Sequence, residues 1–216
     1  MGRFKTILFD FDGTVFDTVE GITKSIQYAL AMHGRTAELE DLRCFAGPPL
    51  VDKFIEVYGI EKAEAEQLVI DFRERYAPVG VYESRPFPGI EKFLKDLKDL
   101  GFTLCIATSK PQTMAELLLE RSGLTGYFDV IAGSLPGINN QKKYEIVERA
   151  VGLAHADKAG SVLIGDTKYD VEGAKLCGIP CIGVSWGYAA EGELEAAGAI
   201  KIADSMDELK DILISM

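Results

Sequence analysis

Histidine is scarce in this chain, and its few cysteines are not arranged in pairs. The two histidines, His33 and His155, both fall near the ends of expected helices and give little support to a zinc site or a serine–histidine triad. The four cysteines, at positions 44, 105, 177 and 181, form no Cys-x-x-Cys pair. We therefore expect reduced thiols that pack as small apolar side chains, rather than a metal site or a disulfide framework.

Long apolar runs and an excess of basic residues are also missing. No run approaches the roughly 18 apolar residues that read as a membrane span, and the first expected strand leaves no room for a signal peptide, so we expect a cytoplasmic protein. The 23 basic and 34 acidic residues give a net charge of −11, which argues against nucleic-acid or anionic-membrane partners. An anionic substrate would need a metal ion and a few basic side chains to reverse this field locally.

What the chain does have is an acidic signature directly after an apolar run. Thr6-Ile7-Leu8-Phe9 predicts a buried strand, and Asp10-Phe11-Asp12-Gly13-Thr14 follows it. Residues two apart on a strand point the same way, so Asp10 and Asp12 can face one spot just beyond the strand. Two acids at the end of a buried strand are costly unless positive charge lies between them. The pattern therefore favours a chemical role over a plain turn.

The spacing of apolar residues differs between two parts of the chain. Residues 17–82 have helical spacing, with helices expected over about 17–33, 50–58 and 61–76 and a short one near Leu39 and Leu42. After Phe87-Pro88-Gly89, helices alternate with strands expected over 103–107, 128–132, 161–164, 181–184 and near 200. This predicts an α/β fold: a Rossmann-like, doubly wound parallel sheet from residues 1–16 and 83–216, with an all-helical cap of residues 17–82 inserted. An insertion at this point can close over a site like a lid.

Two further expected strands also end in polar residues. One leads into Thr108-Ser109-Lys110-Pro111, and the other into Gly165-Asp166-Thr167-Lys168-Tyr169-Asp170. Ligands of open parallel sheets bind beyond the strand carboxyl ends, so we expect Asp10, Asp12, Asp166 and Asp170 to form an oxygen-rich cluster suited to Mg²⁺. Without a cation, four converging acids would repel one another. Alone, Thr108-Ser109 would fit a helix cap before Pro111, and Asp170 would fit the cap of the next helix.

These signatures resemble, in their order, the motifs of the haloacid dehalogenase superfamily of phosphatases and phosphotransferases. The chain has Asp-x-Asp-Gly-Thr, then a Thr after an apolar strand, then a Lys before a helix, then Gly-Asp-x-x-x-Asp. The helical insertion is similar to the cap of this superfamily. Gly47-Pro48-Pro49-Leu50 and the stretch 183–188 are similar to segments of phosphoglycolate phosphatase-like members. The resemblance covers essentially the whole chain.

The resemblance implies a Mg²⁺-dependent phosphatase that hydrolyses a small phosphomonoester through an aspartyl-phosphate intermediate. Asp10 would be the nucleophile. Asp12 would act as acid and then base, and its backbone carbonyl would bind the metal. Asp166 would be a metal ligand, and Asp170 either a ligand or a partner of one.

The same resemblance places phosphate-binding groups elsewhere in the chain. Thr108, the backbone around Ser109, and a lysine before a helix would stabilise the charged phosphoryl group. The family pattern selects Lys143 for this role, with Lys142 as the alternative. In the cap, Arg43 and Lys53 flank Gly47-Pro48-Pro49-Leu50 and would reach an anionic leaving group, although each also fits a solvated surface cation.

Three other functions compete with a phosphatase. A sugar phosphomutase of the same superfamily keeps both aspartates, and differs by shielding its aspartyl-phosphate from water. A phosphonoacetaldehyde hydrolase would use a cap lysine such as Lys53, but its chemistry does not need an acid at position 12. A phospho-receiver module has an acidic pocket on an α/β sheet, yet has no reason to insert a helical domain after its first strand.

Overall fold

The computed structural model describes residues 3–137 and 141–216. The chain divides into two compact units, Met1–Phe16 with Pro86–Met216, and Asp17–Arg85. We call the first the α/β unit and the second the helical unit. Two short strands, β2 (Phe16–Asp17) and β3 (Arg85–Pro86), form a separate two-stranded sheet.

The α/β unit is built on a parallel sheet. In the part of the chain that the structure describes, its six strands are β1 (Thr6–Phe9), β4 (Thr103–Pro111), β5 (Val130–Ser134), β6 (Ser161–Gly165), β7 (Cys181–Val184) and β8 (Lys201–Ala203). Their order is β5-β4-β1-β6-β7-β8, and neighbouring strands run parallel. β1 therefore lies in the middle, and all four of its residues are buried, as its apolar sequence requires.

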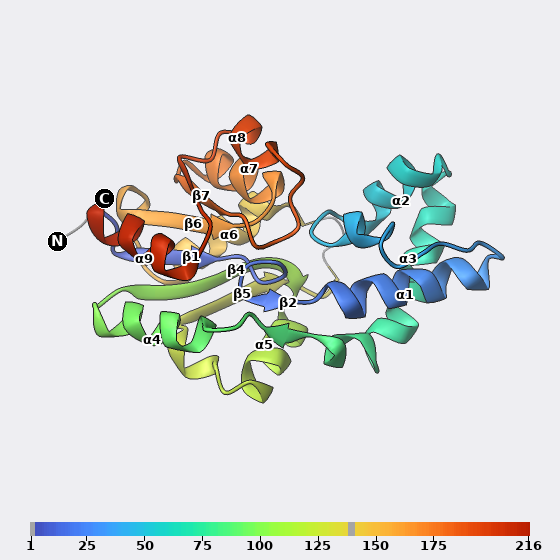
Figure 1. The fold of residues 1–216 in the computed structure, drawn as a ribbon, viewed down its shortest axis with the longest axis horizontal. Helices are drawn as coiled ribbons and strands as arrows, with labels where there is room; N and C mark the ends of the chain where they lie inside the picture. The colour runs from blue at the N-terminus through green and yellow to red at the C-terminus, as the bar shows by residue number, and fades with distance from the viewer. Residues whose placement is uncertain (1–2, 138–140) are drawn as a thin grey trace. The chain divides into compact units, whose positions relative to one another are not determined.

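Helices cover both faces of this sheet. They are α4 (Ile90–Asp99), α5 (Gln112–Arg121), α6 (Lys143–Leu153), α7 (Lys168–Cys177), α8 (Glu193–Ala197) and α9 (Met206–Ser215), with 3₁₀ helices η3 (Thr125–Tyr127) and η4 (Lys158–Gly160). Figure 1 shows α4 and α5 on one side of the sheet and α6 and α7 on the other. Along β1, Phe9 packs edge-to-face on Phe93 of α4 at 6.2 Å between ring centroids, whereas Leu8 joins a core with Ile146 of α6 and Val171 of α7. This arrangement confirms the predicted α/β fold class.

The helical unit contains α1 (Val19–Met32), α2 (Leu50–Tyr58) and α3 (Lys62–Tyr76), with 3₁₀ helices η1 (Arg43–Phe45) and η2 (Gly80–Glu83). Its own core includes Phe54 and Leu68, both fully buried. At Gly21 of α1, an added Cβ would lie 2.0 Å from the carbonyl oxygen of Gly80, so a side chain cannot fit there. Arg75 of α3 binds Glu83 of η2 through both ends of its guanidinium, at 2.9 and 3.0 Å.

Three local predictions differ from the structure, and one helix was missed. The segment around Leu39 and Leu42 forms turns that lead into η1 and not an α-helix, and Leu42 is buried directly before η1. β4 continues to Pro111 and does not end at Ala107, and β5 begins at Val130, two residues later than expected. The short helix α8 was not predicted at all.

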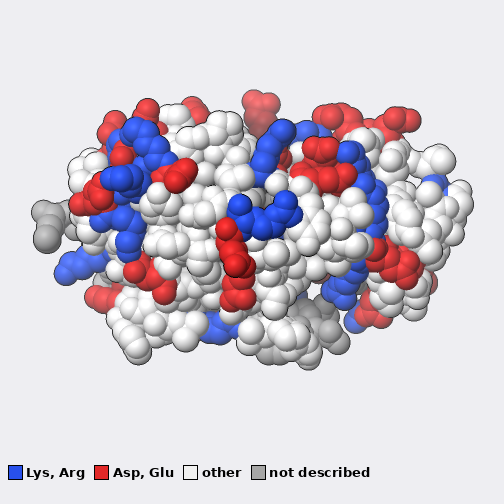
Figure 2. Space-filling model, turned by 90° about the horizontal axis from the view of Figure 1, so that it is seen from below, with Lys and Arg blue, Asp and Glu red and all other residues white. Residues whose placement is uncertain are grey.

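The surface mixes charges of both signs. On the face drawn in Figure 2, Lys and Arg side chains lie beside Asp and Glu side chains. Surface pairs of this kind include Lys92–Asp96 at 2.8 Å and Lys98–Asp129 at 2.7 Å. Within the described residues, no helix is both long and apolar enough to cross a membrane.

Candidate active site

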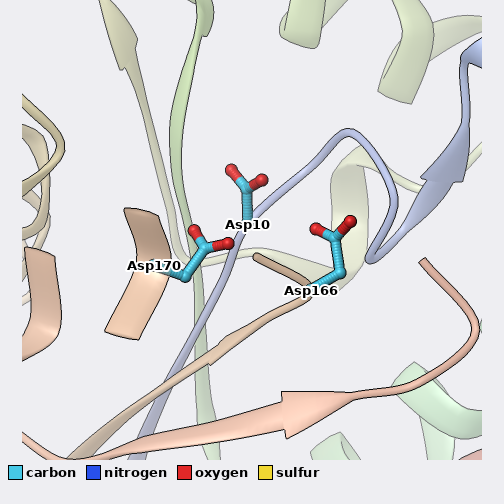
Figure 3. Close-up of side chains that lie close together, drawn as sticks. All are labelled: Asp10, Asp166 and Asp170. Atoms are coloured by element: carbon cyan, nitrogen blue, oxygen red, sulfur yellow. The ribbon is translucent and has the colours of Figure 1, made fainter. Parts of the chain in front are cut away.

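Three buried aspartates meet at the carboxyl end of the central strands. Asp10 follows β1, Asp166 follows β6, and Asp170 lies in the first turn of α7. Carboxylate oxygens from the three side chains lie within 4.8 Å of one another, and Figure 3 shows the three groups around a common point. The parallel register aligns Phe9 with Ile164, and the Asp10 N–H donates to the Ile164 carbonyl at 2.8 Å. The sheet itself therefore brings Asp10 and Asp166 to one level.

Asp12 belongs to the same loop, but its carboxylate points to a different partner. The loop turns sharply at Gly13, whose φ of +85° lies in the left-handed region. Phe11 and Phe16 stack at 4.5 Å on either side of the turn and anchor it in the core. The Asp12 carboxylate accepts from the Lys110 ammonium at 3.0 Å and lies outside the three-aspartate group. Of the four acids expected to cluster, three share one point, and Asp12 pairs with a lysine beside them.

Lys143 lies between two of the clustered acids. Its ammonium is 2.6 Å from Asp10 Oδ1 and 2.7 Å from Asp170 Oδ1, and its side chain is 8% exposed. The stem of Lys143 passes Gly173 of α7, where an added Cβ would come within 2.6 Å of Lys143 Cγ. Lys142, the alternative weighed in the sequence, is exposed.

Burial and the neighbouring charges together set the pKa values of the site. Burial raises the pKa of Asp10 to about 6, although the ammonium of Lys143 acts in the opposite direction. Burial, reinforced by the charges of Asp170 and Asp10, raises the pKa of Asp166 well above its ordinary value. For Lys143, burial opposes the charge, but Asp10 and Asp170 outweigh it and raise the pKa of the ammonium.

Asp170 serves both as a helix cap and as a member of the cluster. Its Oδ2 accepts from the N–H and the hydroxyl of Thr167, both at 3.0 Å, while its Oδ1 faces Lys143. The bonds to Thr167 close a capping box at the start of α7. One oxygen of Asp170 thus caps α7, as the sequence allowed, and the other lies in the acid cluster against Lys143.

The donor set fits a hard divalent cation. Carboxylate oxygens are the ligands that Mg²⁺ prefers. Across the site, four carboxyl groups face the two ammonium groups of Lys110 and Lys143. With all four carboxyl groups ionised, two negative charges remain, and one divalent cation would cancel them. Asp10, Asp166 and Asp170 are placed to hold it.

Thr108, Ser109 and Lys110 lie on the extension of β4. Thr108 and Lys110 are buried, and Ser109 between them is exposed, as alternation along a strand requires. The Thr108 hydroxyl accepts from the Lys110 N–H at 3.2 Å. Sequence reasoning missed Lys110, because these residues were placed after the strand, where no alternation applies. A strand extended by three residues would have put Lys110 on the Thr108 face.

Arg43 and Lys53 belong to the helical unit and bind acids of that unit. Arg43 is about half exposed (51%) and lies 3.7 Å from Glu40. Lys53 is 16% exposed and lies 2.8 Å from Glu56. Their predicted contact with a leaving group would form only when substrate is bound, so it stays a prediction.

Comparison with known proteins places these features in a family. A model of the family described as "haloacid dehalogenase-like hydrolase" matches residues 7–184. A 5′-nucleotidase of Pseudomonas aeruginosa is 37% identical over 99% of this chain and 97% of its own length. A phosphoglycolate phosphatase of Cupriavidus necator is 32% identical over 96% of this chain and 92% of its own.

Two further similarities bear on function. The tyrosine-protein kinase PtkA of Mycobacterium tuberculosis is 30% identical over 96% of this chain and 72% of its own length. Among solved structures, one described as a predicted phosphatase from Clostridium acetobutylicum is 36% identical, covers 99% of both chains and has a TM-score of 0.94.

Proposed function

The chain belongs to the haloacid dehalogenase-like hydrolases, and we propose that it is a Mg²⁺-dependent phosphatase acting on a small phosphomonoester through an aspartyl-phosphate intermediate. The membership confirms the resemblance seen in the sequence. A phosphatase is favoured because relatives over nearly the full chain are named 5′-nucleotidase and phosphoglycolate phosphatase.

One observation carries the proposal. The buried carboxylate directly after the central strand contacts an ammonium group and lies beside two further acids. Asp10 is 8% exposed and lies 2.6 Å from Lys143. With a pKa of about 6, it is ionised at neutral pH and available as a nucleophile. Lys143 faces the same point and would neutralise an incoming phosphoryl group instead of leaving Asp10 to repel it.

In the first step, an Asp10 oxygen attacks phosphorus and the bond from phosphorus to the leaving oxygen breaks. Asp12, two residues along the loop, gives a proton to the leaving oxygen, which departs as an alcohol. Thr108 and Lys143, with backbone N–H groups near Phe11 and Ser109, hold the phosphoryl oxygens.

In the second step, water attacks the phosphorus of the aspartyl-phosphate while Asp12 takes its proton. The bond between phosphorus and Asp10 breaks, which releases inorganic phosphate and restores the Asp10 carboxylate. A divalent cation held by Asp10, Asp166, Asp170 and the Asp12 carbonyl would supply positive charge against the phosphoryl oxygens throughout.

We further propose that residues 17–82 act as a cap that selects the leaving group. The α/β unit holds the groups that any phosphomonoester would use, so discrimination must come from contacts beyond the phosphoryl group. Arg43 and Lys53 are the cap cations proposed for an anionic leaving group. A phosphate-transfer role is the alternative that the PtkA similarity raises.

A substrate panel with purified full-length protein tests the proposal. We expect release of inorganic phosphate from nucleoside monophosphates, phosphoglycolate and sugar phosphates to require Mg²⁺ and to stop with EDTA. Isomerised sugar phosphate without released phosphate would indicate a mutase. Phosphorylated protein without turnover would indicate a receiver, and phosphate transfer from ATP to tyrosine would indicate a kinase.

Asp10→Asn should abolish turnover and the acid-stable phosphoprotein in rapid-quench experiments, while the circular dichroism spectrum stays that of the wild type. Asp207→Asn is the matched control, because the Asp207 side chain is 93% exposed. Appreciable Mg²⁺-dependent activity in a clean Asp10→Asn preparation would remove Asp10 from the nucleophile role.

A further inference from the structure

Trp186, the chain's one tryptophan, lies in the loop after β7 and is connected to the three-aspartate group by hydrogen bonds. Its indole N–H donates to the carbonyl of Thr14 at 3.2 Å. The Thr14 hydroxyl in turn donates to Asp166 Oδ1 at 3.1 Å, across 152 residues of sequence. Thr14 is 1% exposed and Asp166 is fully buried, so water does not compete for this bond.

The same loop also reaches Asp166 directly. The Tyr188 N–H donates to Asp166 Oδ2 at 2.9 Å. Each carboxylate oxygen therefore has a donor, one from the loop after β1 and one from the loop after β7. A carboxylate oxygen carries two lone pairs, so an oxygen that accepts one hydrogen bond can still bind a cation.

Two glycines allow this close approach. A Cβ added at Gly187 would lie 2.2 Å from Asp166 Cβ and 2.4 Å from its Oδ2. A Cβ added at Gly13 would lie 2.0 Å from the same Oδ2. Both backbones pass the carboxylate at distances that any side chain would prevent, so Asp166 has little room to turn.

We propose that Trp186, Gly187 and Tyr188 form, together with Thr14, a clamp that orients the Asp166 carboxylate for the divalent cation. Trp186 is a positioning residue that acts through Thr14 and touches neither substrate nor cation. The clamp is needed because Asp10 and Asp170 lie close to Asp166, and their like charges would turn a free carboxylate away. The inference rests on the proposed function, since the cation is part of it.

The test is a calorimetric titration of each protein with Mg²⁺ alone, without substrate. Thr14→Val keeps the size of the side chain and removes the hydroxyl, and we expect it to weaken Mg²⁺ binding about 10- to 100-fold. Thr14→Ser keeps the hydroxyl and should bind close to the wild type. Trp186→Phe keeps an aromatic ring and should weaken binding about fivefold, the equivalent of one neutral hydrogen bond.

Tyr127→Phe is the control. It removes one side-chain hydrogen bond of similar length, to Glu91 at 3.3 Å on the surface of the same unit, and should leave Mg²⁺ binding unchanged. Thermal melts in EDTA separate a loss of folding from a loss of orientation. If the substitutions only misorient Asp166, saturating Mg²⁺ should restore most of the kcat that the variants lose at limiting Mg²⁺.

The double variant Thr14→Val with Trp186→Phe decides whether Trp186 acts through Thr14. If it does, the double variant binds Mg²⁺ no more weakly than Thr14→Val alone. Additive losses, or wild-type binding by Thr14→Val, would overturn the clamp while leaving the phosphatase proposal intact. Failure of the wild type itself to bind Mg²⁺ would overturn the proposed function and the clamp with it.

Discussion

Lys143 is the residue on which the charge balance of the site depends. It offers one ammonium group to the carboxylates of Asp10 and Asp170. Lys143→Met should lower kcat/KM by at least about 100-fold for every phosphomonoester, and by similar factors, because all substrates share the phosphoryl group. Lys142→Met is the control and should remain close to the wild type, since Lys142 is exposed. Losses confined to a few substrates would instead assign Lys143 to the leaving group.

The sequence could not separate these adjacent lysines on physical grounds. Successive residues of a helix point about 100° apart, so which one faces the sheet depends on where the helix begins. α6 begins at Lys143, and Gly173 of α7 makes room for its stem. The spacing in the family pattern carried that information, whereas composition and charge did not.

Lys110 is, like Lys143, a buried lysine that contacts an acid of the site. Its side chain is 3% exposed, lies 3.0 Å from Asp12 Oδ1, and is 5.7 Å from the centre of the Phe11 ring. Lys110→Met should lower the free energy of unfolding by on the order of 3 kcal/mol, because Asp12 loses its partner in a poorly hydrated place. It should also lower kcat more than it raises KM. Asp12, the proposed acid and base, would no longer be held in place by Lys110.

Urea unfolding and steady-state kinetics measure both effects. The double variant Lys110→Met with Asp12→Asn should recover part of the stability and none of the activity. A Lys110→Met protein with wild-type stability would mean that the pair with Asp12 contributes nothing measurable to the fold.

Among the elements, β4 is one that the sequence pattern predicts only in part. Its first part, Thr103–Ala107, was predicted from its apolar run. The remainder is polar and ends at Pro111, which has no N–H to donate to a strand ladder, and its register against β5 shifts between Ala107 and Pro111. The segment pairs with β5 again at Pro111 and Ser134. The polar residues of the site fall on this second part, which is why one of them was missed.

Elements of the helical unit should affect selectivity more than chemistry. Arg43→Ala in η1 and Lys53→Ala in α2 should reorder the substrate panel, with the largest losses for anionic leaving groups. A buried charged contact is worth roughly 2–5 kcal/mol when one partner is truncated, so relative preferences should change at least about tenfold. Lys62→Ala in α3 is the control, because its side chain is 65% exposed. Parallel losses across the panel would leave the unit as a cover without a selective role.

For the whole molecule, the acids of the site predict how stability depends on pH without metal. The folded protein keeps the Asp10 proton up to about pH 6, whereas the unfolded chain releases it near 3.8. Between these values the folded state binds more protons, so this group lowers the free energy of unfolding as the pH rises. The full effect is about 3 kcal/mol, reached above pH 6.

Asp10→Asn removes this titration and also the charge through which Asp10 raises the pKa of Asp166, and both changes act in the same direction. Urea unfolding in EDTA should therefore show the variant gaining stability relative to the wild type as the pH rises from 4 to 7. Asp207→Asn should show no such trend, because its side chain is exposed. A constant difference between the wild type and Asp10→Asn would mean that Asp10 does not titrate in this range.

The position of Trp186 also has an optical consequence. With one tryptophan and eight tyrosines, light absorbed by indole alone excites a single ring in the entire protein. That ring is half-buried and one hydrogen bond from Thr14, which itself contacts Asp166. The tryptophan fluorescence of the whole molecule therefore comes from one ring near the carboxylates. Its emission wavelength and its quenching would follow occupancy of the site, without an attached dye.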